Sequence, residues 1–524
     1  MLTLDSTLGS QPREPGFSSR AEWKNLGGFS DTLRPCPPSS EWVPVKKMLR
    51  AVRTVVPRVP ALVHGSHMST VPQVCIVGSG PAGFYTAQQI LKSHPAAQVD
   101  MYEKLPTPFG LVRYGVAPDH PEVKNCINTF TQTAGQERFA FLGNVEVGRN
   151  VLLHQLREAY HAVVLAYGAS EDRALGVPGE SVANVLSARR FVGWYNGLPG
   201  DAYLPVSLDV ESAVVVGHGN VAVDVARILL TPIDILRKTD IPECVLAALA
   251  QSRVRRVVLV GRRGPEHVAL TIKELREMVR LPGCRPNLQP NDYLHLRQLI
   301  PSLPRPRKRL LELLAKTALD EPDPKLASAY ASAEREWSLR FLRSPVEVLS
   351  SDGQRVSGLR LVKNRLEGEE GQQRAVPTEE METLECGLVL RSIGYRGLLL
   401  DASLPFDYHT ATIANTDGRV TGHSGLYVSG WIATGPVGVI LSTMTSGFNT
   451  GKAVVADLEA GAADKDQGKG GGKAIKRLLS DKGVEVVSFD KWLRLDQHEV
   501  EAGARLGKPR EKVTSWQRMV ELTR

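Results

Sequence analysis

Two segments of the chain repeat one pattern, in which a short apolar strand runs into a glycine-rich turn and then into a helix. Residues 74–91 read VCIVGSGPAGFYTAQQIL, and residues 213–230 read AVVVGHGNVAVDVARILL. Strands that alternate with helices in this way favour parallel sheets with helices on both faces. We therefore predict an α/β fold with two Rossmann-like domains, each built around one of the two turns.

The first turn has the spacing G-x-G-x-x-G at Gly78, Gly80 and Gly83. The first glycine permits the tight turn, the second lets the backbone approach a pyrophosphate, and the third lets the helix pack on the strand. Free N–H groups at the start of the helix attract the anion. Glu103 lies twenty residues later, at the end of a second strand, where an acid accepts hydrogen bonds from ribose hydroxyls. These features predict a dinucleotide site; the alternative is a glycine-rich turn with a purely structural role.

The second turn has the variant spacing G-x-G-x-x-A, from Gly217 to Ala222. The strand after its helix ends in Arg262 and Arg263 instead of an acid. Arginines pair bidentately with a phosphate, whereas a carboxylate would repel it. The pattern therefore favours NADP over NAD, unless the two arginines only solvate a loop. Two dinucleotide folds in one chain are typical of flavoproteins in which one domain holds the flavin and the other delivers the nicotinamide.

The six cysteines exclude several kinds of redox and metal site. The closest two are 39 residues apart, so the sequence holds no CxxC pair, zinc knuckle or sequence-local iron–sulfur motif. The histidines form no HExxH-type cluster, and we predict no metal site.

No stretch approaches the ~20 continuous apolar residues of a membrane-spanning helix.

Positive charge is concentrated in one part of the chain. The net charge is +8, whereas residues 253–309 alone hold fourteen Lys and Arg against four Asp and Glu. Such a field attracts an acidic partner, a phosphate ligand or nucleic acid. The alternative is an ordinary solvated surface.

The N-terminal residues 1–72 lack the apolar periodicity of a folded domain. The part that begins at Met48 carries three arginines among apolar residues and no acid before Asp100. This is the pattern of a mitochondrial targeting peptide. We therefore expect residues 1–47, which do contain acids, to be an upstream extension; the alternative is a leader without a targeting role.

Longer motifs resemble the mitochondrial NADPH–ferredoxin (adrenodoxin) reductase family. The resemblance runs from about Val74 to the C-terminus, and residues 1–72 lie outside it. Besides the two turns, it is carried by YEKLPTPFGLVRYGVAPDHPEVKN, VGRRGP, TIKELREM, PRPRKRL and SGWIATGPVGVI.

The resemblance implies a cofactor set and an electron path. FAD and NADP(H) would be the cofactors, and hydride would pass from NADPH to FAD. Single electrons would then pass to an acidic [2Fe-2S] ferredoxin, adrenodoxin, docked on the basic segment 253–309. This ferredoxin would supply mitochondrial cytochromes P450 of steroid and cholesterol metabolism and iron–sulfur cluster assembly. The implied location is the matrix side of the mitochondrial inner membrane, with peripheral membrane association left open and no nucleic acid as a partner.

The resemblance also assigns residues to each site. The FAD site would comprise Gly78, Gly80, Ala82, Gly83, Glu103, Leu111, Val147, Trp431, Gly438, Val439 and Ile440. The NADP site would comprise His218, Gly219, Asn220, Val221, Arg262, Arg263, Glu274 and Gly438. The ferredoxin would contact Arg305 and Arg309, and His120 and Asp224 would form a proton path or a purely structural hydrogen bond. One departure is His218, since the family usually has Gln there.

We also predict a discontinuous domain organisation, in which the strands at 162–169 and 387–395 mark the crossings between the two domains. The FAD domain would consist of residues 73–171 and 391–458, with the NADP domain, residues 172–390, inserted between them. The charged, glycine-rich residues 459–474 are predicted to be a linker. Residues 475–524 would then pack on the FAD domain.

Two other functions fit part of the sequence. A flavin monooxygenase would use the same cofactors to hydroxylate a substrate with oxygen. A redox-sensing scaffold without enzymatic activity would use the basic face on nucleic acid. Rapid ferredoxin reduction without a further substrate would distinguish the reductase from both alternatives.

Overall fold

The computed structural model describes residues 71–369, 372–461 and 468–524, which belong to one compact unit, Met68–Arg524. The predicted leader and targeting peptide, up to residue 70, lie outside the described residues.

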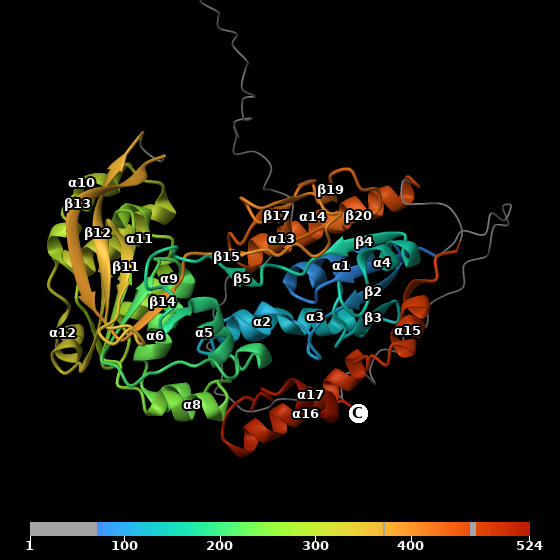
Figure 1. The fold of residues 1–524 in the computed structure, drawn as a ribbon, viewed down its shortest axis with the longest axis horizontal. Helices are drawn as coiled ribbons and strands as arrows, with labels where there is room; N and C mark the ends of the chain where they lie inside the picture. The colour runs from blue at the N-terminus through green and yellow to red at the C-terminus, as the bar shows by residue number, and fades with distance from the viewer. Residues whose placement is uncertain (1–70, 370–371, 462–467) are drawn as a thin grey trace, which may run out of the picture. The chain divides into compact units, whose positions relative to one another are not determined.

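The first glycine-rich turn lies in a sheet of seven strands (Figure 1). Their order is β18-β19-β20-β4-β1-β2-β3, and β20, β4, β1, β2 and β3 are parallel. Val74 lies opposite Val99 on β2 and Ala162 on β4. The strands span β1 (Gln73–Val77), β2 (Gln98–Tyr102), β3 (Phe139–Leu142), β4 (Ala162–Leu165), β18 (Asn415–Thr416), β19 (Arg419–Val420) and β20 (Leu426–Val428).

Side chains of β1 alternate between two apolar cores because successive residues of a strand point to opposite faces. Val74 and Ile76 belong to the core that the sheet shares with α1 (Pro81–Ser93), α3 (Cys126–Ala134), α14 (Ile440–Glu459) and α16 (Phe489–Arg505). Cys75 and Val77 belong to the core on the other face, which is covered by α4 (Leu153–Ala159) and α15 (Gly471–Asp481). The sheet is therefore the middle layer of three.

The second glycine-rich turn lies in a parallel sheet of six strands, in the order β6-β14-β7-β8-β10-β9. One face packs on α5 (Ala188–Tyr195), α6 (Asn220–Leu230), α8 (Glu243–Ala250), α9 (Ile272–Val279) and α11 (Arg305–Leu319). An antiparallel sheet of β11 (Arg343–Leu349), β12 (Gly358–Glu367) and β13 (Arg374–Glu385) covers the other face. The six strands span β6 (Val185–Ser187), β7 (Ser212–Val216), β8 (Arg256–Val260), β9 (Cys284–Pro286), β10 (Arg335–Arg340) and β14 (Leu388–Arg391).

The second fold is inserted into the first, as predicted. The chain leaves the first sheet through β5 (Glu171–Asp172) and returns through β15 (Tyr395–Arg396), and these two strands pair antiparallel. All strands of the six-stranded sheet lie between them, and the chain then adds β18, β19 and β20 to the first sheet. The remaining helices and short strands are α2 (Leu111–Tyr114), α7 (Ile233–Leu236), α10 (Leu296–Leu299), α12 (Pro324–Ala331), α13 (Trp431–Thr434), α17 (Trp516–Leu522), β16 (Phe406–Asp407) and β17 (Thr412–Ile413).

The predicted linker at 459–474 is too long at its C-terminal end. Helix α15 already begins at Gly471, and Gly471 and Gly472 are buried against Gln73 and Asp100. A side chain at Gly472 would lie 2.4 Å from an oxygen of Asp100, so these glycines allow close packing instead of flexibility. Glycine-rich composition was therefore a misleading signal at this position.

The described helices include none that could span a bilayer.

Candidate active site

The first glycine-rich turn combines two closely packed glycines with one that faces open space. A Cβ atom on Gly78, whose φ is +106°, would lie 2.5 Å from the carbonyl oxygen of Ala166. A Cβ on Gly83 would lie 2.1 Å from the carbonyl oxygen of Gly78, whereas a Cβ on Gly80 would meet no atom within 4 Å. Gly80 is also the N-cap of α1 and provides no side-chain cap. The helix N–H groups therefore face an open space suited to a pyrophosphate.

Glu103 is held at the edge of this turn. One carboxylate oxygen accepts hydrogen bonds from the backbone N–H (3.1 Å) and the hydroxyl (2.7 Å) of Ser79, and the other accepts one from the N–H of Leu105 (3.0 Å). The residue is buried. These bonds orient a negative group beside the open space, as a ribose-binding acid requires.

Residues distant in the sequence complete the surroundings of the first turn. A Cβ on Gly110 would lie 3.1 Å from Cα of Gly80, so the start of α2 adjoins the turn and places the partly exposed Leu111 there. A Cβ on Gly430 would lie 2.5 Å from Cβ of Ala82, so the start of α13 also adjoins it. Val147, in contrast, is buried among apolar side chains of the sheet core.

The segment between α13 and α14 exposes apolar side chains. Val437, Val439 and Leu441 are 75%, 53% and 64% exposed, and Val439 is the N-cap of α14. The indole N–H of Trp431 is buried and has no hydrogen-bond partner among the described residues. Gly438 has a φ of +90°, and Ile440 packs against the sheet core. Exposed apolar groups beside a free helix N-terminus suit a flat ring with a polar edge.

The second turn repeats the geometry of the first. A Cβ on Gly217 would lie 2.2 Å from the carbonyl oxygen of Ser392, whereas a Cβ on Gly219 would meet no atom within 4 Å. Gly219 is the N-cap of α6, again without a side-chain cap. The side chain of Asn220 accepts a hydrogen bond from the N–H of Thr271 (2.9 Å), and Val221 packs against the core of the second fold.

The imidazole of His218 points into the protein, away from the open space. Its Nε2 donates a hydrogen bond to the carbonyl oxygen of Leu259 (3.0 Å), and the ring packs edge-on against Phe341. Burial lowers the pKa of His218 to about 4, so the ring is neutral at physiological pH. At this position only the backbone can contact a pyrophosphate.

Arg262 and Arg263 follow the end of β8 and are both exposed. Their carbonyl oxygens accept hydrogen bonds from the Asn364 side chain (3.1 Å) and from the N–H of Leu342 (3.2 Å). No described acidic residue forms an ion pair with either side chain. The backbone is thus held in place while both guanidinium groups are available to a phosphate.

A network of charged groups joins the two folds around Arg227 of α6. Its guanidinium, which is buried, donates to Asp224 (2.6 Å) and Glu274 (2.8 Å) of its own fold. It also binds both carboxylate oxygens of Asp119, which precedes His120 in the first fold. Glu277 lies 3.4 Å from Arg227.

His120 and Asp224, the two residues of the predicted proton path, both belong to this network. His120 Nε2 lies 2.6 Å from a carboxylate oxygen of Glu277. No hydrogen bond joins the described side chains of His120 and Asp224 directly; Glu277 and Arg227 lie between them. Burial, with a contribution from the charge of Glu274, raises the pKa of Asp224 to about 7, although Arg227 opposes the shift. Asp224 can therefore gain or lose a proton near neutral pH.

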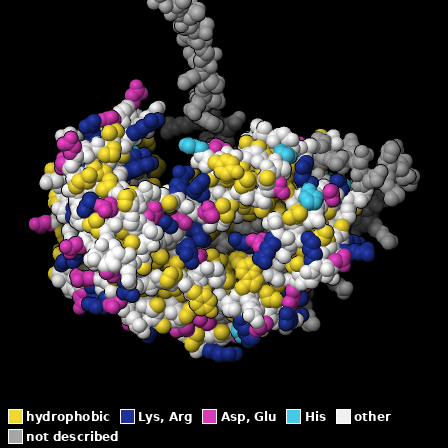
Figure 2. All heavy atoms as spheres, viewed as in Figure 1, with side chains coloured by type: hydrophobic (Ala, Val, Ile, Leu, Met, Phe, Trp, Pro, Cys, Tyr) yellow, Lys and Arg dark blue, Asp and Glu magenta, His cyan; other side chains and the backbone are white. Residues whose placement is uncertain are grey.

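The basic segment 253–309 is less uniformly positive in the structure than in the sequence. Five of its basic residues form ion pairs with acids: Arg253, Arg256, Lys273, Arg285 and Arg297. Arg307 turns inward and donates to the carbonyl oxygens of Glu266 and Val268. Figure 2 likewise shows basic side chains interspersed with acidic ones over the face that it presents.

Two packed helices of this segment retain exposed arginines. Arg305 and Arg309 lie four residues apart on α11, and Arg276 on α9 lies four residues before Arg280, the C-cap of α9. Residues at this spacing share one face of a helix. Since α9 and α11 are in contact, the four arginines belong to one pair of helices.

Comparison with known proteins identifies the family. The sequence profile of the family described as "Pyridine nucleotide-disulphide oxidoreductase" matches residues 72–260. The human protein "NADPH:adrenodoxin oxidoreductase, mitochondrial" is 58% identical over 88% of this chain and 93% of its own length. The Drosophila melanogaster protein of the same name is 44% identical over 87% of this chain and 94% of its own. The chain belongs to the family of mitochondrial NADPH:adrenodoxin oxidoreductases.

A solved structure agrees with this family and with the fold. FprA from Mycobacterium tuberculosis in complex with NADPH matches with a TM-score of 0.80 at 38% identity, over 86% of this chain and 99% of its own. The predicted membership and the two Rossmann-like folds are confirmed.

Sequence reasoning missed the central residue of the charged network. Asp224 and Arg227 lie three residues apart on one helix, a spacing that allows an ion pair, and this was a usable signal. Asp119 and Glu277 gave no comparable signal. Asp119 reaches Arg227 only through the packing of the two folds, and Glu277 reaches it through the packing of α9 against α6.

The raised pKa of Asp224 makes the stability of the protein depend on pH. Between the unfolded value of about 3.8 and the folded value of about 7, the folded state holds one more proton at this site than the unfolded state. Stability is therefore lost as pH rises through this window. Asp224→Asn removes the titration and keeps an oxygen for Arg227. The Tm of the variant minus the Tm of wild type, measured by calorimetry, should increase by roughly 4 °C or more from pH 4.5 to pH 8. A difference that does not change with pH would contradict the assignment.

Proposed function

We propose that this chain is a mitochondrial FAD-dependent NADPH:adrenodoxin oxidoreductase. The observation that carries the proposal is the presence of two open glycine turns in one chain, the second followed by two exposed arginines. Relatives up to 58% identical over most of the chain are named for this activity. The monooxygenase and the nucleic-acid scaffold find no support among these relatives.

The first fold suits FAD. The turn at 78–83 and the N-terminus of α1 would hold the pyrophosphate, and Glu103 would bind the ribose hydroxyls. Leu111, Trp431 and residues 438–440 would surround the ring, while Val147 would support it from the core. When bound, FAD accepts a hydride and releases electrons one at a time. The protein orients this group, and the positive end of α14 favours negative charge beside it.

The second fold suits NADPH. The turn at 217–222 would hold the pyrophosphate through its backbone, since the ring of His218 is turned inward. Arg262 and Arg263 would pair with the 2′-phosphate. Glu274 would contact the ribose, and the hydrogen bond that it accepts from Arg227 (2.8 Å) would fix its orientation. His120 and Asp224 would carry a proton to or from the site.

We further propose that an acidic [2Fe-2S] ferredoxin docks on the exposed arginines of α11 and α9. Arg305 and Arg309 are free of ion pairs with described residues, and opposite charge speeds encounter and orients docking. Arg307 donates to the carbonyl oxygens of Glu266 and Val268, which follow Arg262 and Arg263 in the chain. The start of α11 therefore lies at the same edge of the sheet as these arginines and the second turn. In mitochondria the reduced partner would serve cytochromes P450 and iron–sulfur cluster assembly on the matrix side of the inner membrane.

Charge reversal at the docking site should separate the two half-reactions. In Arg305→Glu plus Arg309→Glu, ferricyanide reduction should stay near the wild-type rate. Ferredoxin-dependent reduction of cytochrome c should fall at least tenfold at low salt, because attraction becomes repulsion. The wild-type rate should fall steeply with salt, since the Debye length shortens to about 8 Å at physiological ionic strength, and the variant rate should depend on salt less.

A matched control is Arg253→Glu plus Arg285→Glu. It makes the same change of charge in the same basic segment, but next to the N-terminal ends of β8 and β10, at the opposite edge of the sheet. It should retain ferredoxin reduction. Equal losses in the two double variants would show that only net charge matters and would refute a docking site on α11.

A further inference from the structure

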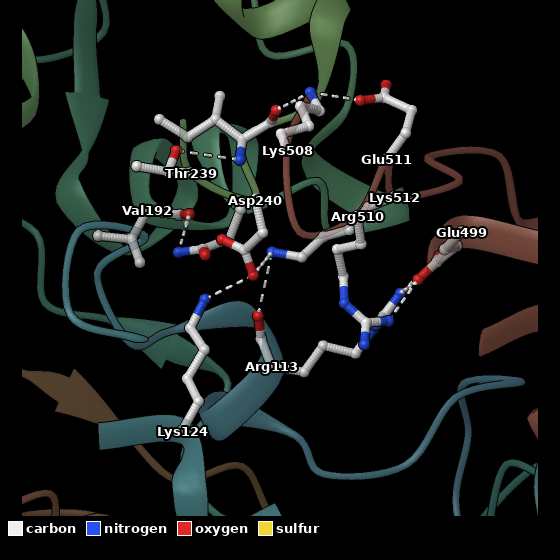
Figure 3. Close-up of polar contacts among 12 residues, drawn as sticks. Arg113, Lys124, Val192, Thr239, Asp240, Glu499, Lys508, Arg510, Glu511 and Lys512 are labelled. Atoms are coloured by element: carbon white, nitrogen blue, oxygen red, sulfur yellow. Dashed lines mark hydrogen bonds and ion pairs between the residues drawn. The ribbon is translucent and has the colours of Figure 1, made fainter. Parts of the chain in front are cut away.

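The loop between α16 and α17 contacts both folds. Its residues Lys508 and Lys512 have ammonium groups in the interior, with side chains 0% and 1% exposed. Figure 3 shows that both lysines bind residues of the second fold, whereas the helix before them binds the first. These contacts with the second fold come in addition to the predicted packing of residues 475–524 on the FAD domain.

Lys512 connects the second fold to the first through one ammonium group. Its Nζ lies 3.0 Å from a carboxylate oxygen of Asp240 and donates to the carbonyl oxygen of Arg113 (3.4 Å). The same oxygen of Asp240 accepts a hydrogen bond from Lys124 of the first fold (2.7 Å). Figure 3 shows both ammonium groups directed at this carboxylate. Asp240 thus receives two cations, neither of which comes from its own fold.

Lys508 adds a second attachment just beyond Asp240. Its Nζ donates to the carbonyl oxygen of Ile241 (2.6 Å) and to the carboxylate of Glu243 (2.8 Å). Glu511 accepts a hydrogen bond from the N–H of Glu243 (3.0 Å), at the start of α8. Residues 240–243 are therefore held by the C-terminal loop at several points.

The other end of the loop is anchored to the first fold by Glu499 of α16. This residue is fully buried and accepts two hydrogen bonds from Arg113 (2.6 and 2.7 Å). It also accepts bonds from Arg510 (3.0 Å) and from the N–H of Val513 (3.0 Å). The backbone at Arg510 passes close to Gly503, where a Cβ atom would lie 2.3 Å from the Cα of Arg510.

Arg113 links this anchor to the first glycine turn. It lies on α2, which begins directly after Gly110, the residue that adjoins Gly80. A continuous set of contacts therefore runs from the first turn through Arg113 and Lys512 to Asp240 of the second fold. The Asp119–Arg227 contact is a separate link between the folds. One contact point allows two bodies to rotate, whereas two separate points restrict their orientation.

We propose that Lys512, together with Asp240, is a positioning residue for hydride transfer: the C-terminal loop clasps the two folds so that the nicotinamide and flavin sites face each other. The proposal rests on the proposed function. Burial lowers the pKa of Lys512 to about 7, so keeping this ammonium charged in the interior has a cost in stability. A buried ionic contact of this kind is better suited to specifying an orientation than to adding stability.

The test is to remove the contact while leaving both cofactor sites intact. In Lys512→Met, FAD content and the Kd for NADP⁺ should stay within about twofold of wild type. The rate of flavin reduction by saturating NADPH, followed by stopped-flow absorbance, should fall about tenfold or more, because small misplacements of reacting groups are costly. Oxidation of the photoreduced variant by ferricyanide should be unchanged. Hydrogen exchange should rise at amides 240–246 and 506–515.

Matched variants separate positioning from general destabilisation. Lys512→Arg keeps the charge and should restore most of the reduction rate, and Asp240→Asn should reproduce the loss. Lys482→Met removes a lysine of the same C-terminal region and should have no effect. Among the described residues, its ammonium group bonds to the carbonyl oxygen of Asn150 (2.9 Å) in the first fold.

Several results would overturn the proposal. One is an unchanged reduction rate in Lys512→Met, and another is an equal loss of rate in Lys512→Arg. A third is the failure of both Lys512→Met and Asp240→Asn to hold FAD, since neither residue is assigned to the FAD site. If wild-type protein bound no flavin or showed no reduction by NADPH, the proposed function itself would fail, whatever the role of Lys512 and Asp240.

Discussion

Gly80→Val is expected to give a folded, colourless protein that has lost its FAD. A Cβ at this position meets no protein atom within 4 Å, and the φ of −74° is accessible to any residue, so the fold should tolerate valine. The added methyl groups would instead fill the space in which the backbone must approach the pyrophosphate. Flavin absorbance of the purified protein should fall at least tenfold, with far-UV circular dichroism unchanged.

Two glycine variants serve as controls for this result. Gly219→Val makes the same change in the second turn, where space is equally open, and should retain FAD but lose reduction by NADPH. Gly200→Val lies in the short 3-10 helix Pro199–Asp201, where the glycine is exposed and a Cβ meets no atom within 4 Å, so it should behave as wild type. Full flavin content in Gly80→Val would refute the placement of the pyrophosphate.

Arg262→Ala plus Arg263→Ala should shift the cofactor preference from NADPH toward NADH. Charge-assisted hydrogen bonds to a phosphate are among the strong ones, and the loss of each should reduce kcat/KM for NADPH about tenfold or more. NADH lacks the 2′-phosphate, so its kcat/KM should hardly change. The ratio of the two values, measured with ferricyanide as acceptor, should therefore fall about a hundredfold or more.

The control for this experiment is Arg253→Ala plus Arg285→Ala. It removes the same charge from the opposite edge of the same sheet, near the N-terminal ends of β8 and β10. The ratio of kcat/KM for NADPH to that for NADH should stay unchanged. An equal loss with NADPH and NADH in the Arg262 and Arg263 variant would indicate that these residues support the fold instead of binding the phosphate.

Local features of the site followed from the sequence because the residues that create them are close along the chain. Gly78, Gly80 and Gly83 lie within one turn, in which Gly78 and Gly83 are closely packed and Gly80 faces open space. Arg262 and Arg263 follow the end of β8 after one residue, Gly261, which fixes their position at the edge of the sheet.

Composition was a weaker guide where packing competes with it. The glycines at 471 and 472 resembled a linker, yet they permit close contact between α15 and the first sheet. The basic segment looked uniformly positive, yet five of its cations pair with acids, most of which come from outside it, since ion pairs depend on neighbours in space. His218 was predicted to lie at the pyrophosphate, but only the fold decided that its ring turns inward.

The sequence by itself determined the two glycine-rich turns, the place of Arg262 and Arg263 after a strand, and the family, because each depends on contiguous residues with a fixed local geometry. Only the tertiary structure decided how the two folds are joined. Arg227 meets Asp119, and Lys512 meets Asp240, across 108 and 272 positions of the chain respectively. No local pattern encodes such pairs, because they form only when separate elements pack and bury their charges together.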